Sequence, residues 1–309
     1  MQYDDLPESG NVEDRRGQGG GFGGGGFGMP GAGGLSIGTI VVLGLLGWAL
    51  GIDPSYLIGG AEIFSRNEPR VETPSQPGRT GAPTDESGRF VSRILGSTEA
   101  VWRDVFSKDG KTYTPPVLVL YNGQTRSQCG GQAQAAMGPF YCPSDRKVYL
   151  DTSFFKQIET RFHGCDGRAC QFSQAYVIAH EVGHHVQNLL GILGKATSAE
   201  NAAGSRAGAN HIQVEVELQA DCFAGLWAKR ENDLLISQGK RAMIEPGDVE
   251  AALRTAAAIG DDTLQKRSQG YAVPDSFTHG TSAQRQRWFE TGFRNGTVAS
   301  CNTFAAQQL

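Results

Sequence analysis

The segment Ile178–His185, which reads IAHEVGHH, constrains the fold of this chain more than any other segment. It lies inside an apolar-periodic run from Phe172 to about Leu190, whose spacing predicts a largely buried helix. Residues four apart on a helix project from one face, so His180 and His184 can both bind a single metal ion. The pattern H-E-x-x-H therefore predicts two zinc ligands on one buried helix.

A catalytic zinc needs a third protein ligand and an open position, and the next predicted helix, residues 209–237, offers carboxylates. Glu217 and Asp221 share one face of that helix. With Glu217 as the third ligand, Asp221 can accept the remaining imidazole N–H of His180. Glu215 lies about 200° around the helix from Glu217 and is expected to be exposed. The alternatives are core histidines with satisfied hydrogen bonds and a solvated helix face around Glu217.

Three further residues are weighed for catalysis. Glu181, between the two histidines, is the candidate general base, because it lies beside the open position of such a site. His279 is the first candidate for an oxyanion partner and Tyr271 the second. A helix-capping or solvent-facing role is the alternative for His279. His185 lies about 100° from His184 on the helix and is expected to pack rather than bind metal.

Other features have expected roles outside this site. Asp261 and Asp262 are expected to form a turn or a helix cap. The hairpin around Tyr149 can offer a strand edge to an extended peptide. A last helix is predicted at residues 282–293. Its arginine face, formed by Arg285, Arg287 and the following Arg294, is expected to be solvated, and contact with anionic lipid headgroups is the alternative.

An uncharged stretch divides the chain near its amino end. Leu35–Ile52 holds 18 residues without a charge, enough to span about 27 Å as a helix. A buried helix of a soluble domain is the alternative, which four glycines make less favourable. Residues 17–34 contain 12 glycines. We therefore expect a disordered tail at 1–34, a membrane anchor at 35–58, a linker at 59–87 and a folded domain at 88–309.

The cysteines indicate the side of the membrane, because the Lys/Arg bias around the anchor is almost flat. All of them follow residue 58, which favours disulfides in an oxidising compartment and a domain outside the cytoplasm. A structural zinc site is the alternative, but the chain has no C-x-x-C pair. Proximity suggests the pairs Cys129–Cys142 and Cys165–Cys170, which leaves Cys222 to pair with Cys301.

Composition and the order of the predicted elements limit the classes of function and of fold. A net charge of −4 and a pI near 5.9 argue against a nucleic-acid partner, which requires a basic face. Short strands are predicted at 117–121, 140–142 and 147–150, with helices on both sides and mainly behind them in sequence. This order indicates an α+β domain that is mostly helical with a small sheet.

Several strings together resemble the neutral zinc metallopeptidase (YpfJ-like) family of bacteria. They are H-E-x-G-H-H, E-x-x-A-D at 217–221, Thr278-His279-Gly280 with Arg285 and Trp288-Phe289, and the opening Asn11–Arg16. The E-x-x-A-D string is also similar to that of the HtpX and CAAX-processing peptidases, in which the Glu is the third zinc ligand. The resemblance implies a gluzincin-like fold and favours Glu217 over Glu215.

These observations lead to an expected function. The chain is expected to be a zinc-dependent endopeptidase, attached to the bacterial inner membrane by one crossing, with an extracytoplasmic domain that cleaves peptides or proteins. Membrane lipid is the expected partner of the anchor, and the oligomeric state is left open. The alternative is a membrane-tethered assembly or binding factor whose metal site is structural.

Overall fold

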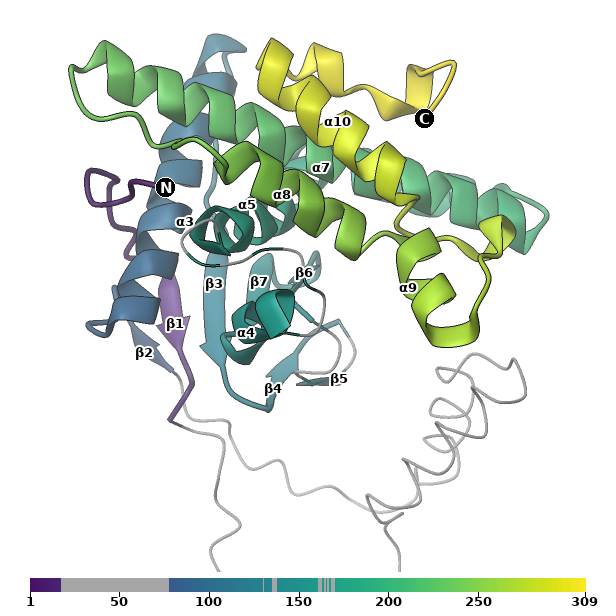
Figure 1. Ribbon diagram of the computed structural model, residues 1–309, viewed down its shortest axis with the longest axis horizontal. Coiled ribbons are helices and arrows are strands. Elements are labelled where there is room, and N and C mark those ends of the chain that lie inside the picture. Colours follow the sequence, from purple (N-terminus) through teal and green to yellow (C-terminus); the bar gives the residue numbers. More distant parts are fainter. Residues whose placement is uncertain are drawn as a thin grey trace, which may run out of the picture. The chain divides into compact units, whose positions relative to one another are not determined.

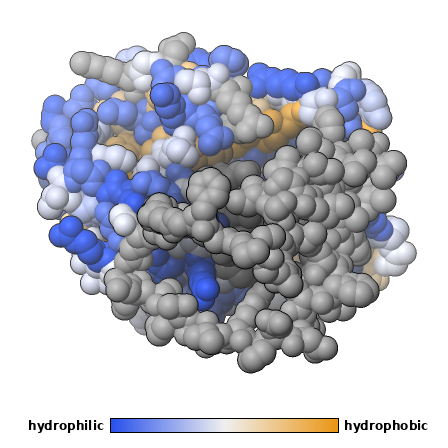
Figure 2. Space-filling view, turned by 90° about the horizontal axis from the view of Figure 1, so that it is seen from below, coloured by the Kyte–Doolittle hydropathy of each residue, from blue (hydrophilic) through white to orange (hydrophobic). Residues whose placement is uncertain are grey.

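A computed structural model of the chain describes residues 1–17, 78–129, 131–134, 138–160, 163, 165, 167 and 170–309. All of these belong to one unit, which combines the amino-terminal residues with everything after residue 77. The expected anchor at 35–58 and most of the glycine tract and linker lie outside the described residues. Among the residues that are described, no helix is long and apolar enough to cross a membrane. On the face shown in Figure 2, these residues are mainly hydrophilic, with a smaller hydrophobic band among them.

Five short strands form a mixed sheet in the order β2-β1-β3-β7-β6. The central strands β1, β3 and β7 run parallel, while β2 and β6 pair antiparallel at the two edges. A separate antiparallel pair joins β4 to β5. The predicted hairpin of residues 140–142 and 147–150 is confirmed as the β6–β7 pair. The strands are β1 (Val12–Asp14), β2 (Arg79–Thr80), β3 (Val117–Tyr121), β4 (Gln124–Ser127), β5 (Gly131–Gln134), β6 (Phe140–Cys142) and β7 (Lys147–Asp151).

The expectation of disorder at 1–34 is wrong for residues 1–17. Strand β1 lies between β2 and β3, and Val12 is almost completely buried. The side chain of Glu13 pairs with Lys147 of β7 at 2.7 Å, and that of Arg16 hydrogen-bonds Asp85. Backbone pairing on both sides and these ion pairs supply the stabilisation that a three-residue strand lacks alone. The expected linker likewise ends earlier, because β2 starts at residue 79.

The position of β1 bears on the expected membrane topology. Strand β1 precedes residues 35–58 in the chain and β2 follows them, yet the two strands pair antiparallel in one sheet. A single membrane crossing at 35–58 would place these strands on opposite sides of the bilayer. The single-crossing part of the expectation is therefore inconsistent with this sheet.

Alternation along β3 divides the core into two parts. Leu118 and Leu120 point into the main core beneath the helices, whereas Val119 and Tyr121 point into a small cluster on the opposite face. This is the two-residue period of a strand buried on both faces. The apolar run VLVLY is thus explained by helices on one side and by β6 and β7 side chains on the other.

The helices gather on one side of the sheet (Figure 1). Helix α5 lies nearest the sheet, and α7 packs against both α5 and α10. A Cβ atom at Gly292 of α10 would overlap the carbonyl oxygen of Cys222 of α7, so this crossing requires glycine. The helices are α3 (Glu86–Lys108), α4 (Ser153–Thr160), α5 (Cys170–Leu189), α6 (Ile192–Ala202), α7 (Arg206–Ser237), α8 (Asp248–Ala258), α9 (Asp261–Gln269) and α10 (Ser282–Asn295). The helices predicted from the sequence at 172–190, 209–237 and 282–293 correspond to α5, α7 and α10.

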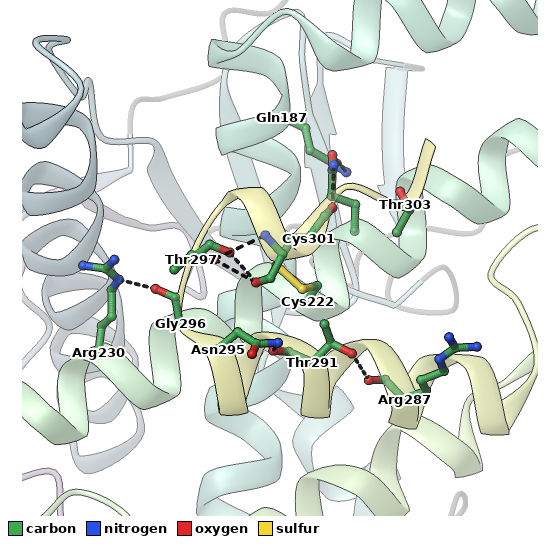
Figure 3. The surroundings of a disulfide bond; sticks show 12 residues. Gln187, Cys222, Arg230, Arg287, Thr291, Asn295, Gly296, Thr297, Cys301 and Thr303 are labelled. Atoms are coloured by element: carbon green, nitrogen blue, oxygen red, sulfur yellow. Dashed lines mark hydrogen bonds between the residues drawn. A yellow bond between two sulfur atoms is a disulfide. The ribbon is translucent and has the colours of Figure 1, made fainter. Parts of the chain in front are cut away.

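Three disulfides pair the six cysteines as predicted from the sequence. The longest loop is closed by Cys222–Cys301, which joins α7 to the short 3-10 helix η4 (Ala299–Cys301) across 79 residues. Figure 3 shows this bond beside α10, with Thr303 of the following turn η5 (Thr303–Ala305) nearby. The hydroxyl of Thr303 donates to the carbonyl oxygen of Glu215 at 2.7 Å. The carboxyl-terminal segment is therefore fixed along α7.

Candidate metal centre

Helices α5 and α7 bring His180, His184 and Glu217 together. One potential ligand atom from each of them lies within 4.8 Å of the others, and all three side chains are largely buried. The Nε2 atom of His180 lies 3.2 Å from one carboxylate oxygen of Glu217, and Nε2 of His184 lies 3.6 Å from the other. The three ligands predicted from the sequence therefore lie close together in the structure.

This arrangement fits zinc. Ligand bonds of about 2.0–2.1 Å in a tetrahedral site place ligand atoms roughly 3.3 Å apart, close to the distances between Glu217 and the two imidazoles. Two nitrogens and one carboxylate oxygen are also the donor set of many catalytic zinc sites, which keep a fourth position open. The other ring nitrogen of each histidine has a hydrogen-bond acceptor of its own, as zinc ligands usually require.

His180 is held by a charged, buried network. Its Nδ1 donates to Asp221 at 2.8 Å, and the same carboxylate accepts from the hydroxyl of Tyr176 at 2.6 Å. Arg285 of α10 binds both oxygens of Asp221, each at 2.9 Å, and also contacts the Tyr176 hydroxyl. Bidentate pairs of this kind are geometrically specific and stronger than neutral hydrogen bonds. Asp221 thus fixes the ring of His180 with Nε2 directed at Glu217.

Charge complementarity shifts the pKa values in this network. Burial opposes ionisation of Asp221, but Arg285 and His180 outweigh it and lower the pKa of Asp221 to about 2. Burial also lowers the pKa of His180, yet the carboxylates of Asp221 and Glu217 raise it to about 10 in the metal-free chain. The pKa of Glu217 is depressed despite burial, because His184 and His279 lie nearby. The centre is therefore built to hold a cation.

His184 is held by neutral groups instead. Its Nδ1 lies 2.8 Å from the amide oxygen of Gln187, one turn further along α5. The amide nitrogen of Gln187 donates to the carbonyl oxygen of Val216, the residue before Glu217, at 2.7 Å. Gln213 donates to Glu217 at 3.0 Å, which orients the third candidate ligand.

A close helix approach makes these contacts possible. A Cβ atom at Gly183 would lie 3.1 Å from the carbonyl oxygen of Ala220, tighter than most such contacts. The glycine within H-E-V-G-H therefore lets α7 come near enough for Glu217 to reach both histidines. The short side chain of Ala220, between Glu217 and Asp221, serves the same contact.

The centre opens into a cavity of about 550 Å³. Glu181 lines it beside both histidines, and its side chain is almost completely buried. Phe140 and Tyr141 of the edge strand β6 form part of one wall, and α6 contributes Leu193 and Glu200. The cavity thus joins the candidate centre to β6, the last strand of the described sheet, and to a mostly apolar wall.

The structure separates the two oxyanion candidates. His279 lines the cavity, with its side chain half exposed. Asp261 holds its loop, because one carboxylate oxygen accepts the backbone N–H groups of Thr278, His279 and Gly280 at 2.6–3.1 Å. Tyr271 is 62% exposed and is not among the described residues that line the cavity.

Several expectations for single residues need correction. Arg285 was expected on a solvated face, but it is 3% exposed because its partner Asp221 lies inside the core. Glu215 is only partly exposed, with its carboxylate near His211 and outside the three-residue cluster. His185 packs as expected. It contacts Tyr141 and the carbonyl oxygen of Thr114, and burial lowers its pKa to about 4.

Four residues around the histidines were not singled out as site residues from the sequence. Tyr176 and Gln187 lie on α5 at positions four before His180 and three after His184, so helical spacing alone could have indicated them. Arg285 and Gln219 come from other helices, and their partners are far away in the sequence. Only the fold brings these two to the site.

Comparisons with known proteins agree with this geometry. A family model described as "Putative neutral zinc metallopeptidase" matches residues 1–304. The chain is 46% identical over 307 residues to the protein called "Uncharacterized protein YpfJ" of Escherichia coli, covering 98% of this chain and 99% of that one. It is 39% identical over 268 residues to "Uncharacterized protein Rv2575" of Mycobacterium tuberculosis, covering 84% and 85%. No solved structure shows a significant match.

Proposed function

We propose, from the premise that this chain belongs to the putative neutral zinc metallopeptidase family, that it is a zinc-dependent endopeptidase. The observation that carries the proposal is the convergence of His180, His184 and Glu217 beside Glu181 in one cavity. A zinc ion held there would supply a Lewis acid that activates a water molecule and polarises the scissile carbonyl.

The chain's own residues supply the remaining chemistry. Glu181 accepts the proton of the attacking water and returns it to the leaving amine, which is general base and then general acid catalysis. His279 donates an N–H to the oxyanion that develops on the carbonyl oxygen. The loop that Asp261 holds keeps His279 in place for this role. Asp221 and Gln187 keep the two ligand rings oriented.

The substrate in this proposal is a peptide in extended conformation. Strand β6 is a sheet edge, and its residues Phe140 and Tyr141 line the cavity. An extended peptide can add to such an edge through backbone hydrogen bonds while its side chains enter pockets. Tyr149 of the expected hairpin is buried in the neighbouring strand β7. The strand to which a peptide would add is therefore β6.

The experiment that tests the proposal compares Glu181→Gln with the unchanged full-length chain. We expect one zinc per chain in both proteins and a loss of peptide cleavage of about 10²–10⁴-fold in the variant. Glu217→Ala should lose zinc, whereas Glu215→Ala, two residues away on α7, should keep both zinc and activity. Zinc retained with no cleavage by either protein would point instead to a binding factor with a structural metal.

A second experiment tests His279 alone. His279→Ala should retain zinc while its kcat falls about 10²–10³-fold, the usual cost of removing one oxyanion donor. Tyr271→Phe is the matched control and should leave kcat unchanged. Equal activity of His279→Ala and the unchanged chain would remove His279 from the mechanism.

The proposal places the domain outside the cytoplasm, at the inner membrane of a bacterium. Its support is that all six cysteines are paired in disulfides. Because β1 pairs with β2, the described residues on the two sides of residues 35–58 would then both lie on that same side of the membrane. Tags before Met1 and after Leu309 should both be protease-accessible from outside. Accessibility of only one tag would contradict the β1–β2 pairing.

A further inference from the structure

The hydrogen bonds that hold His184 continue beyond Gln187. The amide nitrogen of Gln187 also donates to the side-chain oxygen of Gln219 on α7, at 3.1 Å. The amide nitrogen of Gln219 in turn donates to the backbone carbonyl oxygen of Cys301, at 2.9 Å. Gln187 and Gln219 are both almost completely buried, so water does not compete for these bonds.

The direction of this chain of bonds is fixed at its first member. A backbone carbonyl oxygen accepts and never donates, so the NH₂ group of Gln187 must face Val216. Its oxygen therefore faces His184 and accepts the proton of Nδ1. That assigns the proton of His184 to Nδ1 and leaves Nε2 free to bind a metal ion.

The far end of the chain of bonds is covalent. Cys301 is bonded to Cys222, which lies three residues after Gln219 on α7. Residues 219 and 222 of one helix thus both hold Cys301, one through its carbonyl oxygen and one through its sulfur. Figure 3 shows Gln187 next to the segment that carries Cys301.

We propose that Gln187 and Gln219 form a positioning relay through which the Cys222–Cys301 disulfide sets the metal affinity of His184. The relay rests on the metal site of the proposed function, but it makes no use of catalysis. Gln187 and Gln219 are positioning residues, since neither reaches the cavity among the residues that line it. Their effect passes through the orientation and tautomer of one imidazole.

The test measures the zinc dissociation constant of the full-length chain by competition with a chromophoric chelator. Gln187→Leu should weaken zinc binding about 10–100-fold, the usual cost of losing a hydrogen-bond partner of a ligand. Gln219→Leu keeps the bond to His184 and removes its support, so a loss of about 3–10-fold is expected. Because the two act in series, the double variant should bind zinc about as weakly as Gln187→Leu alone.

Two further readouts separate positioning from general loosening. The visible spectrum of the cobalt-substituted chain reports coordination geometry and should change in both glutamine variants. The rise in Tm upon zinc addition should shrink in both, whereas a purely structural defect lowers Tm equally with and without zinc. Cys222→Ala/Cys301→Ala, where it folds, should resemble Gln219→Leu, and Cys165→Ala/Cys170→Ala is the matched disulfide control.

The outcomes are distinct. Zinc affinity of Gln219→Leu within about twofold of the unchanged chain, with an unchanged cobalt spectrum, would overturn the relay alone. So would equal losses of affinity in the two disulfide variants. An unchanged chain that is folded but binds no zinc would overturn the proposed function and the relay with it.

Discussion

His180 and His184 lie one turn apart on α5, yet the groups that hold their rings differ in kind. His180 donates to a carboxylate that carries a full charge and is itself held by an arginine and a tyrosine. His184 donates to an amide, and all the hydrogen bonds that continue from it are between neutral groups. The ring of His180 is thus held by charged groups. The ring of His184 is held by two neutral amides that lead to the Cys222–Cys301 disulfide.

The neutral groups behind His184 limit the number of negative charges that are buried around the centre. A second carboxylate behind His184 would add to the buried acidic groups Glu181, Glu217 and Asp221, and Arg285 is the one buried arginine among the described residues. Neutral hydrogen bonds contribute only about 0.5–1.5 kcal/mol each, so they orient a ring firmly only when their far end is immobile. The disulfide at Cys301 supplies that immobility.

Removal of the Cys222–Cys301 disulfide should cause the largest loss in the free energy of unfolding. Loop-closure entropy assigns about 4.5 kcal/mol to the 79-residue loop of Cys222–Cys301 and about 2 kcal/mol to the 5-residue loop of Cys165–Cys170. Paired alanine variants of each disulfide should therefore differ in their free energy of unfolding by about 2–3 kcal/mol. Chemical denaturation measures this difference. Equal losses would mean that strain or residual structure, rather than loop length, governs both bonds.

Removal of Arg285, the positive charge behind His180, should have the next largest effect on stability. Arg285→Ala leaves Asp221 buried without its guanidinium, which typically costs about 3–5 kcal/mol in the free energy of unfolding. Arg287→Ala, on the exposed face of the same helix, is the control and should change stability by less than about 0.5 kcal/mol. Urea denaturation of both variants gives the comparison. A small loss in Arg285→Ala would show that the network around His180 is not energetically coupled.

The two sides should also differ in metal affinity. Asp221→Asn keeps the shape of the side chain but removes its charge, so zinc affinity should fall about 10–100-fold. Asp233 lies at the exposed end of the same helix, so Asp233→Asn is the control and should leave zinc affinity unchanged. Chelator competition measures both. A loss in Asp221→Asn no larger than that in Gln219→Leu would erase the distinction between the charged and the neutral side.

The smallest expected effect concerns a charged contact away from the centre. Burial opposes ionisation of Glu13, but Arg15 and Lys147 lower its pKa from 4.5 to about 2. Its stabilising contribution is therefore full above about pH 4.5 and is lost as the pH falls towards 2. Glu13→Gln should be less stable by about 1–2 kcal/mol at pH 7, after allowance for solvent screening. That loss of stability should disappear towards pH 2. Glu290→Gln, which removes an exposed ion pair, is the control.

Local patterns predict the centre of the molecule well. Helical spacing places His180 with His184 and Glu217 with Asp221, because both pairs lie four residues apart on one helix. It also predicts that Asp221 receives the N–H of His180. The E-x-x-A-D string selects Glu217 over Glu215 through family resemblance, and the structure likewise brings only Glu217 to the histidines.

What local patterns miss depends on partners far away in the chain. Arg285 looks like one of several exposed helix arginines until α10 packs on α7 through Gly292, which brings it to Asp221. The glutamine relay joins α5, α7 and η4, and no spacing within one helix indicates it. Strand β1 is three residues long and precedes a glycine-rich tract, so its pairing with β3 leaves no periodic signal.

The interior position of β1 has a consequence for assembly. The strand is synthesised first, but its neighbours β2 and β3 emerge only after residue 78, so the sheet cannot close until the polypeptide has supplied both. Once closed, the sheet holds β1 by backbone bonds on both sides and by side-chain ion pairs. A chain cut once between residues 17 and 78 would therefore behave as two associated subunits, with a short peptide completing the larger one.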